Sequence, residues 1–152
     1  MPTLHLMVGL PCSGKTTYAR RLAEEKNALL LTVDVWHLQL YGDDALHEKH
    51  DERHTCIERI MWDVATQVLR MGGDVILDFG FWSRDERNDF RNRAKALGVV
   101  FQLHFMDVPH PELYRRLQIR NRAALGDVFV IPKAFMDQYI SVFEPPDDHE
   151  LV

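Results

Sequence analysis

The eight residues Gly9-Leu10-Pro11-Cys12-Ser13-Gly14-Lys15-Thr16 match the pattern G-x-x-x-x-G-K-[ST] at every fixed position. An apolar run precedes them at residues 4–8, and a segment of helical periodicity follows at residues 16–26. A phosphate-binding loop requires this strand–loop–helix context, because loop N–H groups and the helix N-terminus converge on one anion. The alternative is a glycine-rich turn that matches by chance, and both flanking elements disfavour it.

The residue types in this loop predict how it would bind ATP. Gly9 and Gly14 allow the backbone to wrap a phosphate. Lys15 is expected to reach the β- and γ-phosphates, and Thr16 to offer its hydroxyl to Mg²⁺. We therefore expect ATP to contact eight residues of this segment: Gly9, Pro11, Cys12, Ser13, Gly14, Lys15, Thr16 and Thr17.

The rest of the chain alternates short apolar runs with helical patterns, which is typical of an α/β domain with a parallel sheet. We predict strands at residues 4–8, 28–33, 74–78 and 99–106. Helices are predicted at residues 16–26, 46–71, 83–97, 111–122 and 132–143, with a loop at 123–131. Ser83 and Glu86 form a capping-box pattern at the start of the third of these helices.

Length and composition fit one globular domain spanning residues 1–152, because single cores typically hold ~100–200 residues. Hydrophobic residues make up 46% and charged residues 27%, with no apolar run of the ~20 residues that a membrane crossing needs. No basic leader precedes the first strand, so a cytoplasmic location is expected, with both cysteines reduced. The net charge of −5 disfavours broad attachment to a polyanion, although it leaves a local basic groove possible.

Two carboxylates follow predicted strands, at the sheet edge where ligands of open parallel sheets bind. Asp78 is predicted to end the strand at 74–78 and to hold Mg²⁺ directly or through water; alternatively it caps the next turn. Asp34 follows the strand at 28–33, where it would accept the proton of an attacking hydroxyl. It also fits an N-cap for residues 35–40, and the two roles are compatible.

Aromatic side chains are expected at the same strand ends. Trp36, Phe81 and Trp82 could stack on a base, a sugar face or another ring of the acceptor, or they could belong to the core.

Nearly the whole chain resembles the compact P-loop kinases that include the kinase domain of phage-type polynucleotide 5′-hydroxyl kinases. Zeta-toxin-type and chloramphenicol-phosphotransferase-like kinases are similar as well. The resemblance lies in GLPCSGKTTYARRL at residues 9–22, Asp34, the Val75-Ile-Leu-Asp78 strand with Glu86-Arg87 after it, and the run from Phe105 to Pro109 that leads to Arg116 and Arg120. It implies a three-layer α/β/α sandwich, a mainly parallel four-stranded sheet of order 2-3-1-4 and a helical lid.

The resemblance also implies roles for residues outside the loop. In that family the first Asp is the general base, and an Arg three residues later binds the phosphate of the acceptor. Here those positions are Asp34 and His37, so the permanently charged fork that suits phosphate recognition is missing. Substrate contacts are therefore expected from Asp34, Trp36, His37, Phe81, Trp82 and Arg87.

Arg116 and Arg120 are four residues apart, so they share one face of the predicted helix at 111–122. They resemble the lid arginines of the same family, which implies a catalytic role in neutralising charge on the transferred phosphoryl group, with Arg120 also at the nucleotide. The competing interpretation is a solvated face on which Glu112 pairs with these arginines.

Two further features are assigned no function. His47, His50 and His54 have helical spacing, and we interpret them as part of a solvated helix face rather than as metal ligands. Cys12 lies beside a helix N-terminus and a lysine, a setting that favours a low thiol pKa.

The sequence therefore predicts an ATP- and Mg²⁺-dependent kinase that phosphorylates a hydroxyl of a small-molecule or nucleotide-type acceptor. A polynucleotide 5′-hydroxyl kinase is one alternative, although His37 and the acidic balance favour it less. A non-catalytic ATP-binding switch is the alternative from another class. The oligomeric state and the adenine pocket stay open, with Arg120 and the Pro145-Pro146 turn as candidate neighbours of the adenine.

Overall fold

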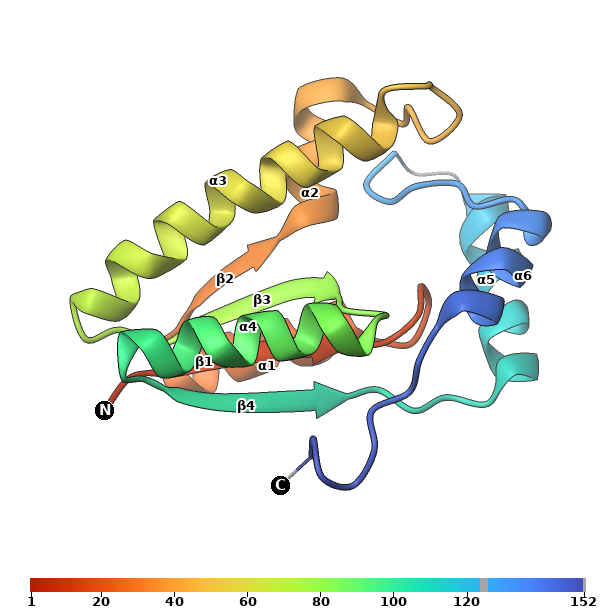
Figure 1. Cartoon of the computed structure of the whole chain (residues 1–152). Helices are drawn as coiled ribbons and strands as arrows, with labels where there is room; N and C mark the ends of the chain where they lie inside the picture. The colour runs from red at the N-terminus through yellow and green to blue at the C-terminus, as the bar shows by residue number, and fades with distance from the viewer. Residues whose placement is uncertain (124–125, 152) are drawn as a thin grey trace.

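The computed structural model describes residues 1–123 and 126–151, and a four-stranded parallel sheet runs through its centre (Figure 1). Its strands are β1 (Thr3–Val8), β2 (Leu29–Thr32), β3 (Val75–Gly80) and β4 (Val100–Phe105). They lie in the order β2-β3-β1-β4, and every neighbouring pair is parallel. This confirms the α/β fold and the strand order predicted from the sequence.

Helices cover both faces of the sheet and the edge at which its strands end (Figure 1). They are α1 (Lys15–Lys26), α2 (Val33–Tyr41), α3 (His50–Arg70), α4 (Arg84–Leu97), α5 (His110–Ala123) and α6 (Lys133–Val142). The helices α5 and α6 stand beyond the carboxyl ends of the strands, where a lid was expected. None of the described helices has the length and apolar composition needed to span a bilayer.

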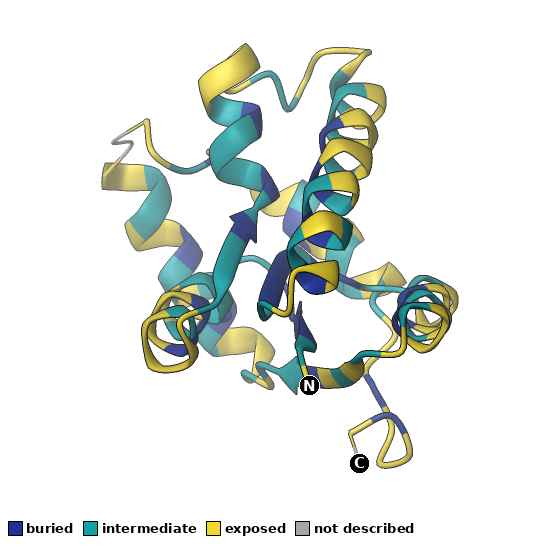
Figure 2. Cartoon of the chain, turned by 90° about the vertical axis from the view of Figure 1, so that its left-hand side faces the viewer, coloured by how far each residue is buried: buried dark blue, intermediate teal, exposed yellow. Residues whose placement is uncertain are grey.

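Alternation along β1 assigns the two faces of the sheet. Leu4, Leu6 and Val8 pack in one cluster with buried residues of α3 and α4, whereas Met7 packs with Ala19 on α1. Successive strand side chains point to opposite faces, so the two central strands, β1 and β3, are buried on both sides (Figure 2). Each large apolar side chain buried in this way contributes about 1.5–3 kcal/mol, which makes these two layers the main source of stability.

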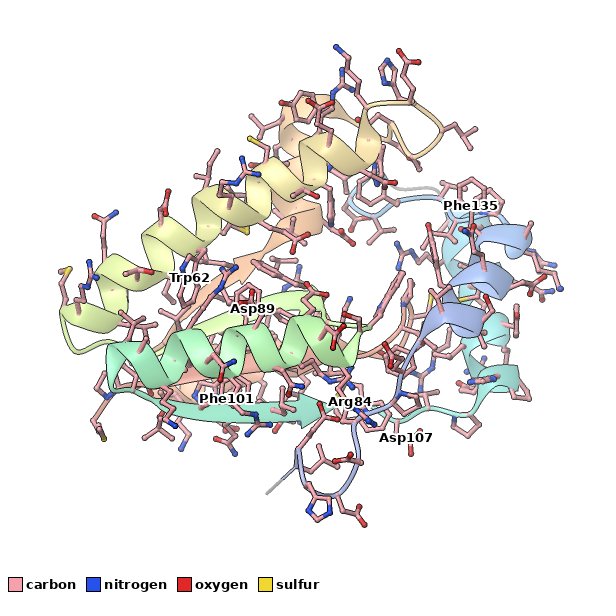
Figure 3. All side chains as sticks on the ribbon, in the orientation of Figure 1. Trp62, Arg84, Asp89, Phe101, Asp107 and Phe135 are labelled. Atoms are coloured by element: carbon pink, nitrogen blue, oxygen red, sulfur yellow. The ribbon has the colours of Figure 1, made fainter. Side chains whose placement is uncertain are left out.

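Aromatic packing joins the two helices on the larger face. Trp62 projects from α3 toward α4 (Figure 3), and its ring meets that of Phe90 edge-on, with 5.4 Å between the ring centroids. The guanidinium of Arg93 lies over both rings. The helices α3 and α4 are thereby held as one layer over β1, β2 and β3.

Several element boundaries follow from local signals. The Ser83 hydroxyl accepts a hydrogen bond of 3.0 Å from the Glu86 amide and caps α4, as the capping-box pattern predicts. Gly98 ends that helix in the left-handed region at φ 70°, and Gly72, at φ 92°, follows the end of α3.

Two predicted boundaries are wrong. The long helix begins at His50 rather than at residue 46, because residues 44–49 form turns in which the His47 amide bonds the Asp44 carbonyl. Strand β3 continues to Gly80, so Asp78 lies within the strand rather than at its end, which rules out the alternative that it caps the next turn.

Arg87 on α4 is completely buried, so it does not contact the acceptor as the sequence predicted. Its Nε and Nη2 donate to the two carboxylate oxygens of Glu150 at 2.8 and 3.2 Å, and its Nη1 donates to the Phe81 carbonyl at 2.9 Å. A bidentate guanidinium–carboxylate pair is strongly directional. The pair therefore anchors the C-terminal segment to α4 and supports the turn after β3.

His5 and His104 lie side by side on β1 and β4, with 2.9 Å between His5 Nδ1 and His104 Nε2. The Tyr18 hydroxyl is 3.3 Å from the other ring nitrogen of His104. Burial, with a smaller contribution from His5, lowers the pKa of His104 to about 4, and burial also lowers the pKa of His5. Both rings are thus held in their neutral form, packed between the sheet and α1.

We expect Arg87→Ala to lower the free energy of unfolding by about 3–5 kcal/mol, because it leaves the Glu150 carboxylate buried without its partner. Arg84→Ala is the matched control: Arg84 also reaches the C-terminal segment, through Asp147 at 3.5 Å, but both side chains are about half exposed. That change should cost about 0–1 kcal/mol. Urea unfolding of both variants makes the comparison, and equal losses would contradict the anchoring role.

The neutral state of His104 predicts a specific pH dependence of stability. Its pKa in the folded protein is about 4, whereas an unfolded chain gives a pKa of about 6.5. Stability from the neutral ring is therefore present above the unfolded value and is lost as the pH falls from there toward 4. Unfolding of wild type and His104→Gln, measured from pH 7 to pH 4, should show the larger loss in wild type. Parallel curves would contradict this assignment.

Candidate active site

The loop between β1 and α1 has the backbone conformation of an anion-binding cradle. Cys12 and Gly14 have positive φ angles of 68° and 86°, and the Ser13 amide bonds the Leu10 carbonyl at 3.2 Å. Successive turns of this kind point backbone N–H groups into one concavity, and α1 begins directly behind it, with its N-terminus toward the same point. The loop therefore fits a chain of phosphates, as its sequence predicts.

Gly9 supports the loop but does not line the cleft above it. Its amide donates to the Gly80 carbonyl at 3.0 Å, and its carbonyl accepts from Trp82 Nε1 at 3.0 Å. A Cβ atom at this position would lie 2.6 Å from the Ser13 hydroxyl oxygen. Glycine fits here because a side chain would crowd Ser13 and Met106. Both backbone groups of Gly9 make structural hydrogen bonds in place of the expected nucleotide contact.

Asp78 lies directly beneath the loop. Its Oδ2 accepts hydrogen bonds from the hydroxyls of Thr16 at 2.7 Å and Thr32 at 3.2 Å, and Lys15 Nζ is 3.8 Å from its Oδ1. That Oδ1 atom is buried and has no hydrogen-bond partner among the described residues. An unpaired buried oxygen beside a threonine hydroxyl fits the oxygen ligands that Mg²⁺ prefers. The residues present therefore suit the expected metal.

Thr32 was not expected at the site. It ends β2 and pairs in register with Asp78 on β3, so their side chains lie on the same face of the sheet. The sequence signal was a threonine at the end of the strand that precedes Asp34. Recognising it required knowing that β2 and β3 are neighbours.

A cleft of about 1040 Å³ opens at the carboxyl ends of the strands, above the phosphate loop. It brings together many of the residues predicted from the sequence: Pro11, Cys12, Ser13, Gly14, Lys15, Thr16, Thr17, Asp34, Phe81, Trp82 and Arg120. Asp78 lies below this surface, in contact with Thr16. Of the expected residues, Gly9, Trp36, His37, Arg87 and Arg116 do not line the cleft.

Asp34 lies in the first turn of α2, whose N-cap is Thr32, so the alternative role of Asp34 as that N-cap is wrong. Its side chain is 46% exposed and lines the cleft, which leaves it accessible to an acceptor. Its Oδ1 lies 3.8 Å from His54 Nε2 on α3. This contact brings a second titratable group to the candidate base.

The three aromatic residues divide between core and cleft. Trp36 packs against the main core and does not reach the cleft. Phe81 is almost fully buried in that core with φ 47°, yet it contributes to the wall of the cleft. Trp82 also lines the wall, and its ring packs at a tilt of 42° against Tyr139 of α6, with 4.7 Å between ring centroids. Stacking on a ligand is thus open to Trp82 and closed to Trp36.

The two arginines on α5 both reach back to the phosphate loop. Arg116 Nη1 donates to the Cys12 carbonyl at 3.0 Å, and its Nε donates to Glu112 at 3.0 Å. Arg120 donates two bonds to the Phe129 carbonyl, and its Nη1 is 3.9 Å from the Cys12 sulfur. Arg116 therefore does pair with Glu112, as the competing interpretation held, but the same side chain also donates to the phosphate loop.

A small apolar cluster holds these arginines over the loop. Its buried members are Leu117, Phe129, Ile131 and Met136, with Cys12 among the residues packed against them. Because residues of α5, α6 and the segment between them share one cluster, the lid packs as a unit against the phosphate loop.

Carboxyl groups dominate the opposite wall of the cleft, which α2, α3 and α4 supply. Asp34, Asp51, Glu58 and Glu86 line it. Burial, together with the nearby charges of Glu86 and Asp34, raises the pKa of Glu58 to about 8, and burial likewise raises the pKa of Glu86. Glu58 therefore carries a proton near neutral pH and can donate a hydrogen bond into the cleft.

His37 is completely buried, so it cannot contact a substrate as expected from its position after Asp34. Its Nε2 is 2.6 Å from Asp44 Oδ1, and its Nδ1 is 3.0 Å from His54 Nδ1. The ring packs edge-on against Tyr41 and Phe129. His37 is thus held by its own helix, the following loop and the lid.

The interpretation of the next histidines as a solvated face holds for His47, which is exposed, and is wrong for His50 and His54. His50 Nδ1 is 2.6 Å from Asp44 Oδ1, and Arg53 Nη1 donates to the second oxygen of Asp44 at 2.9 Å. Burial tends to raise the pKa of Asp44, but hydrogen bonds from His50, Arg53 and His37 keep it well below its usual range. The turn between α2 and α3 places Asp44 where His50 and Arg53 of α3 can contact it.

Both the sequence and the fold have counterparts among known proteins. A family model described as an AAA domain, AAA_33, matches residues 4–146. A search of curated proteins returned no match.

Solved structures share the fold. A chain of the Pnkp1/Rnl/Hen1 RNA repair complex is 25% identical with a TM-score of 0.75; the match covers 92% of this chain and 43% of that one. A sugar kinase from Janibacter sp. is 17% identical, with a TM-score of 0.68 and coverage of 99% and 82%. Kti12 from Chaetomium thermophilum, in complex with ADP-AlF3, is 16% identical, with a TM-score of 0.73 and coverage of 96% and 82%. At identities under 25%, the last two likenesses concern the fold alone.

The family match spans nearly the whole chain, and it agrees with the phosphate loop, the sheet order and the lid. The chain therefore belongs to the AAA_33 family and has the fold of a P-loop kinase.

Proposed function

We propose that this protein transfers the γ-phosphate of ATP to a hydroxyl group of a small-molecule acceptor. The observation that carries the proposal is the cleft itself, which both the phosphate loop and the accessible carboxylate of Asp34 line. A nucleotide-binding switch needs the loop but has no use for a base in that position. The arrangement therefore favours group transfer.

The phosphate side of the cleft would hold Mg-ATP. Lys15 would bind the β- and γ-phosphates, and Thr16 with Asp78 would hold Mg²⁺, directly or through water. When bound, Mg²⁺ neutralises charge on the phosphate oxygens. Arg120 and Arg116, already within reach of the loop, would exchange their carbonyl contacts for phosphate oxygens as the lid closes. A cavity of about 350 Å³ beside the loop, with Pro145 and Pro146 in its wall, is the proposed adenine pocket.

Asp34 would act as the general base. Its carboxylate accepts the proton of the acceptor hydroxyl as that oxygen bonds to the γ-phosphorus, and the bond between this phosphorus and the β,γ-bridging oxygen breaks to release ADP. Half-exposure of Asp34 leaves its oxygens free for this contact, and His54 lies close enough to orient one of them. General-base catalysis of this kind is worth about 10²–10⁴-fold in rate.

The wall opposite the loop favours a neutral, polyhydroxyl acceptor. This wall carries four carboxyl groups. The lysine and arginine side chains that line the described cleft come instead from α1 and α5; they are Lys15, Arg20 and Arg120. A phosphate on the acceptor would meet these carboxyls, and the residue three after Asp34 is a buried histidine bound to Asp44. Hydroxyl groups, in contrast, can donate to the carboxylates and accept from protonated Glu58.

A polynucleotide 5′-hydroxyl acceptor is the second candidate. It is favoured by the likeness to the RNA repair complex, which is 25% identical over 92% of this chain. The net charge of −5 and the acidic wall rank it lower.

We expect Asp34→Asn to lower kcat by about 10²–10⁴-fold, because the amide cannot accept the proton, while the affinity for ATP stays near the wild-type value. Lys15→Ala is the companion variant and should lose both ATP affinity and transfer. Product formation from labelled ATP and equilibrium ATP binding measure the two quantities separately. Undiminished turnover in Asp34→Asn would contradict the base assignment.

The acceptor class is tested with a panel of sugars, nucleosides, hydroxylated antibiotics and 5′-hydroxyl oligonucleotides. We expect phosphate from labelled ATP to appear on a small polyhydroxyl compound, with Lys15→Ala as the inactive control for each. Transfer to oligonucleotide ends alone would overturn the preferred acceptor. No transfer to any member, with intact ATP binding, would favour the switch instead.

A further inference from the structure

The cluster around Asp44 contains more imidazole groups than a structural ion pair needs. Two ring nitrogens, His37 Nε2 and His50 Nδ1, each lie 2.6 Å from the same carboxylate oxygen, Asp44 Oδ1. The centroids of the His37 and His50 rings are 4.5 Å apart, and the ring of His54 lies within 5.6 Å of both. Two ring nitrogens therefore converge on one carboxylate oxygen, with a third imidazole ring beside them.

We propose that His37 Nε2, Asp44 Oδ1 and His50 Nδ1 form a binding site for a transition-metal dication of the Zn²⁺ type. The three donor atoms all lie within 4.8 Å of one another. Two imidazole nitrogens and one carboxylate oxygen are a donor set that suits zinc, and a water would complete four-coordination. Nothing in the proposed phosphotransfer requires this site, since Thr16 and Asp78 serve the Mg²⁺ of the nucleotide.

Small side-chain movements would accommodate the ion. Ligands at the usual ~2.0–2.1 Å from zinc are roughly 3.3 Å apart in a tetrahedron. The two distances of 2.6 Å to Asp44 Oδ1 are those of hydrogen bonds, so each ring would move away by about 0.7 Å as the ion replaces the shared protons. Rotation about the side-chain torsions of His50 supplies part of this opening. The His50 side chain is 20% exposed and lies at the start of α3.

The surroundings of the three ligands resemble the outer shell of a metal site. Arg53 donates to the second oxygen of Asp44 at 2.9 Å, which fixes the carboxylate with one oxygen free for the ion. The Phe129 ring of the lid packs edge-on against both histidine rings. Such partners orient the ligands and keep solvent away from the ion.

The second ring nitrogen of His37 links the site to the candidate base. With an ion on Nε2, the His37 proton moves to Nδ1 and donates to His54 Nδ1, which lies 3.0 Å away. His54 then carries its own proton on Nε2, the atom that lies 3.8 Å from Asp34 Oδ1. His50 would shift its proton from Nδ1 to Nε2 in the same way, so that each of the three rings keeps one proton and none is released. Metal binding would thus set the tautomer of the histidine that faces Asp34.

The site joins three segments: α2 through His37, the following loop through Asp44, and α3 through His50. An ion that binds only the folded state stabilises it, and the gain rises with the logarithm of the free ion concentration once that exceeds the Kd. This predicts a metal-dependent rise in thermal stability that does not depend on ATP.

The test uses the full-length protein, freed of metal with EDTA and exchanged into buffer with excess Mg²⁺ to saturate the nucleotide-metal ligands. Calorimetric titration with Zn²⁺ should give one equivalent per chain, and Co²⁺ should give the visible absorption bands of a tetrahedral ion. Loss of an outer-shell partner typically weakens metal binding roughly 10–100-fold. His50→Ala and Asp44→Asn each remove a ligand, so they should raise the Kd for Zn²⁺ by more than that. His47→Ala, an exposed neighbour on the same segment, should bind like wild type.

Each outcome decides the proposal. Far-ultraviolet circular dichroism shows whether the variants are folded, and His50→Ala is expected to fold because His50 is partly exposed. The proposal is overturned if wild type binds no stoichiometric Zn²⁺, if His50→Ala binds as tightly as wild type, or if His47→Ala weakens binding equally. An unfolded Asp44→Asn leaves His50→Ala to decide. None of these readouts depends on phosphotransfer, so failure of the proposed function leaves the test intact.

Discussion

The parallel pairing of β1 with β3 is the constraint on which the candidate site depends. Leu4, His5 and Leu6 pair in register with Val75, Ile76 and Leu77, and the register shifts before Val8 meets Gly80. This pairing brings the start of the phosphate loop against the end of β3, where the Gly9 amide bonds the Gly80 carbonyl. The Thr16 hydroxyl and the Asp78 carboxylate, 62 residues apart, are thereby 2.7 Å apart. A metal site between them requires no flexible element.

The lid depends on the same loop for its own packing. Arg116 donates to the Cys12 carbonyl, and Arg120 lies near the Cys12 sulfur. The apolar cluster of Leu117, Phe129, Ile131 and Met136 packs beside them. Phe129 also covers the histidine cluster on α2 and α3, and the Val130 amide bonds Asp43 at 3.0 Å. The segment between α5 and α6 thus touches both the nucleotide side and the acceptor side. Closure of the lid over ATP would be felt at the acceptor wall.

Opposite charges line the two walls of the cleft, which would separate the two proposed substrates. Cations from α1 and α5 face the phosphate loop, whereas the carboxyls of α2, α3 and α4 form the other wall. Burial raises the pKa of both Glu58 and Glu86, and the nearby charges of Glu86 and Asp34 add to the shift of Glu58. A wall that mixes carboxylates with a protonated carboxyl has both hydrogen-bond acceptors and a donor. That chemistry suits hydroxyl groups better than phosphates.

The sequence by itself determined the phosphate loop, the α/β class with its strand order, and the position of Asp34, because these depend on local patterns and on a family resemblance. Only the tertiary structure decided which of the surrounding side chains are buried and with which partners they pair. Arg87 and His37 were expected at the substrate, but the first pairs with Glu150 and the second with Asp44. His50 and His54 have the spacing of an exposed helix face, yet a turn at residues 44–49 rotates them inward. Burial and pairing depend on which segments meet in space, and contacts between residues far apart in sequence leave no mark in local periodicity.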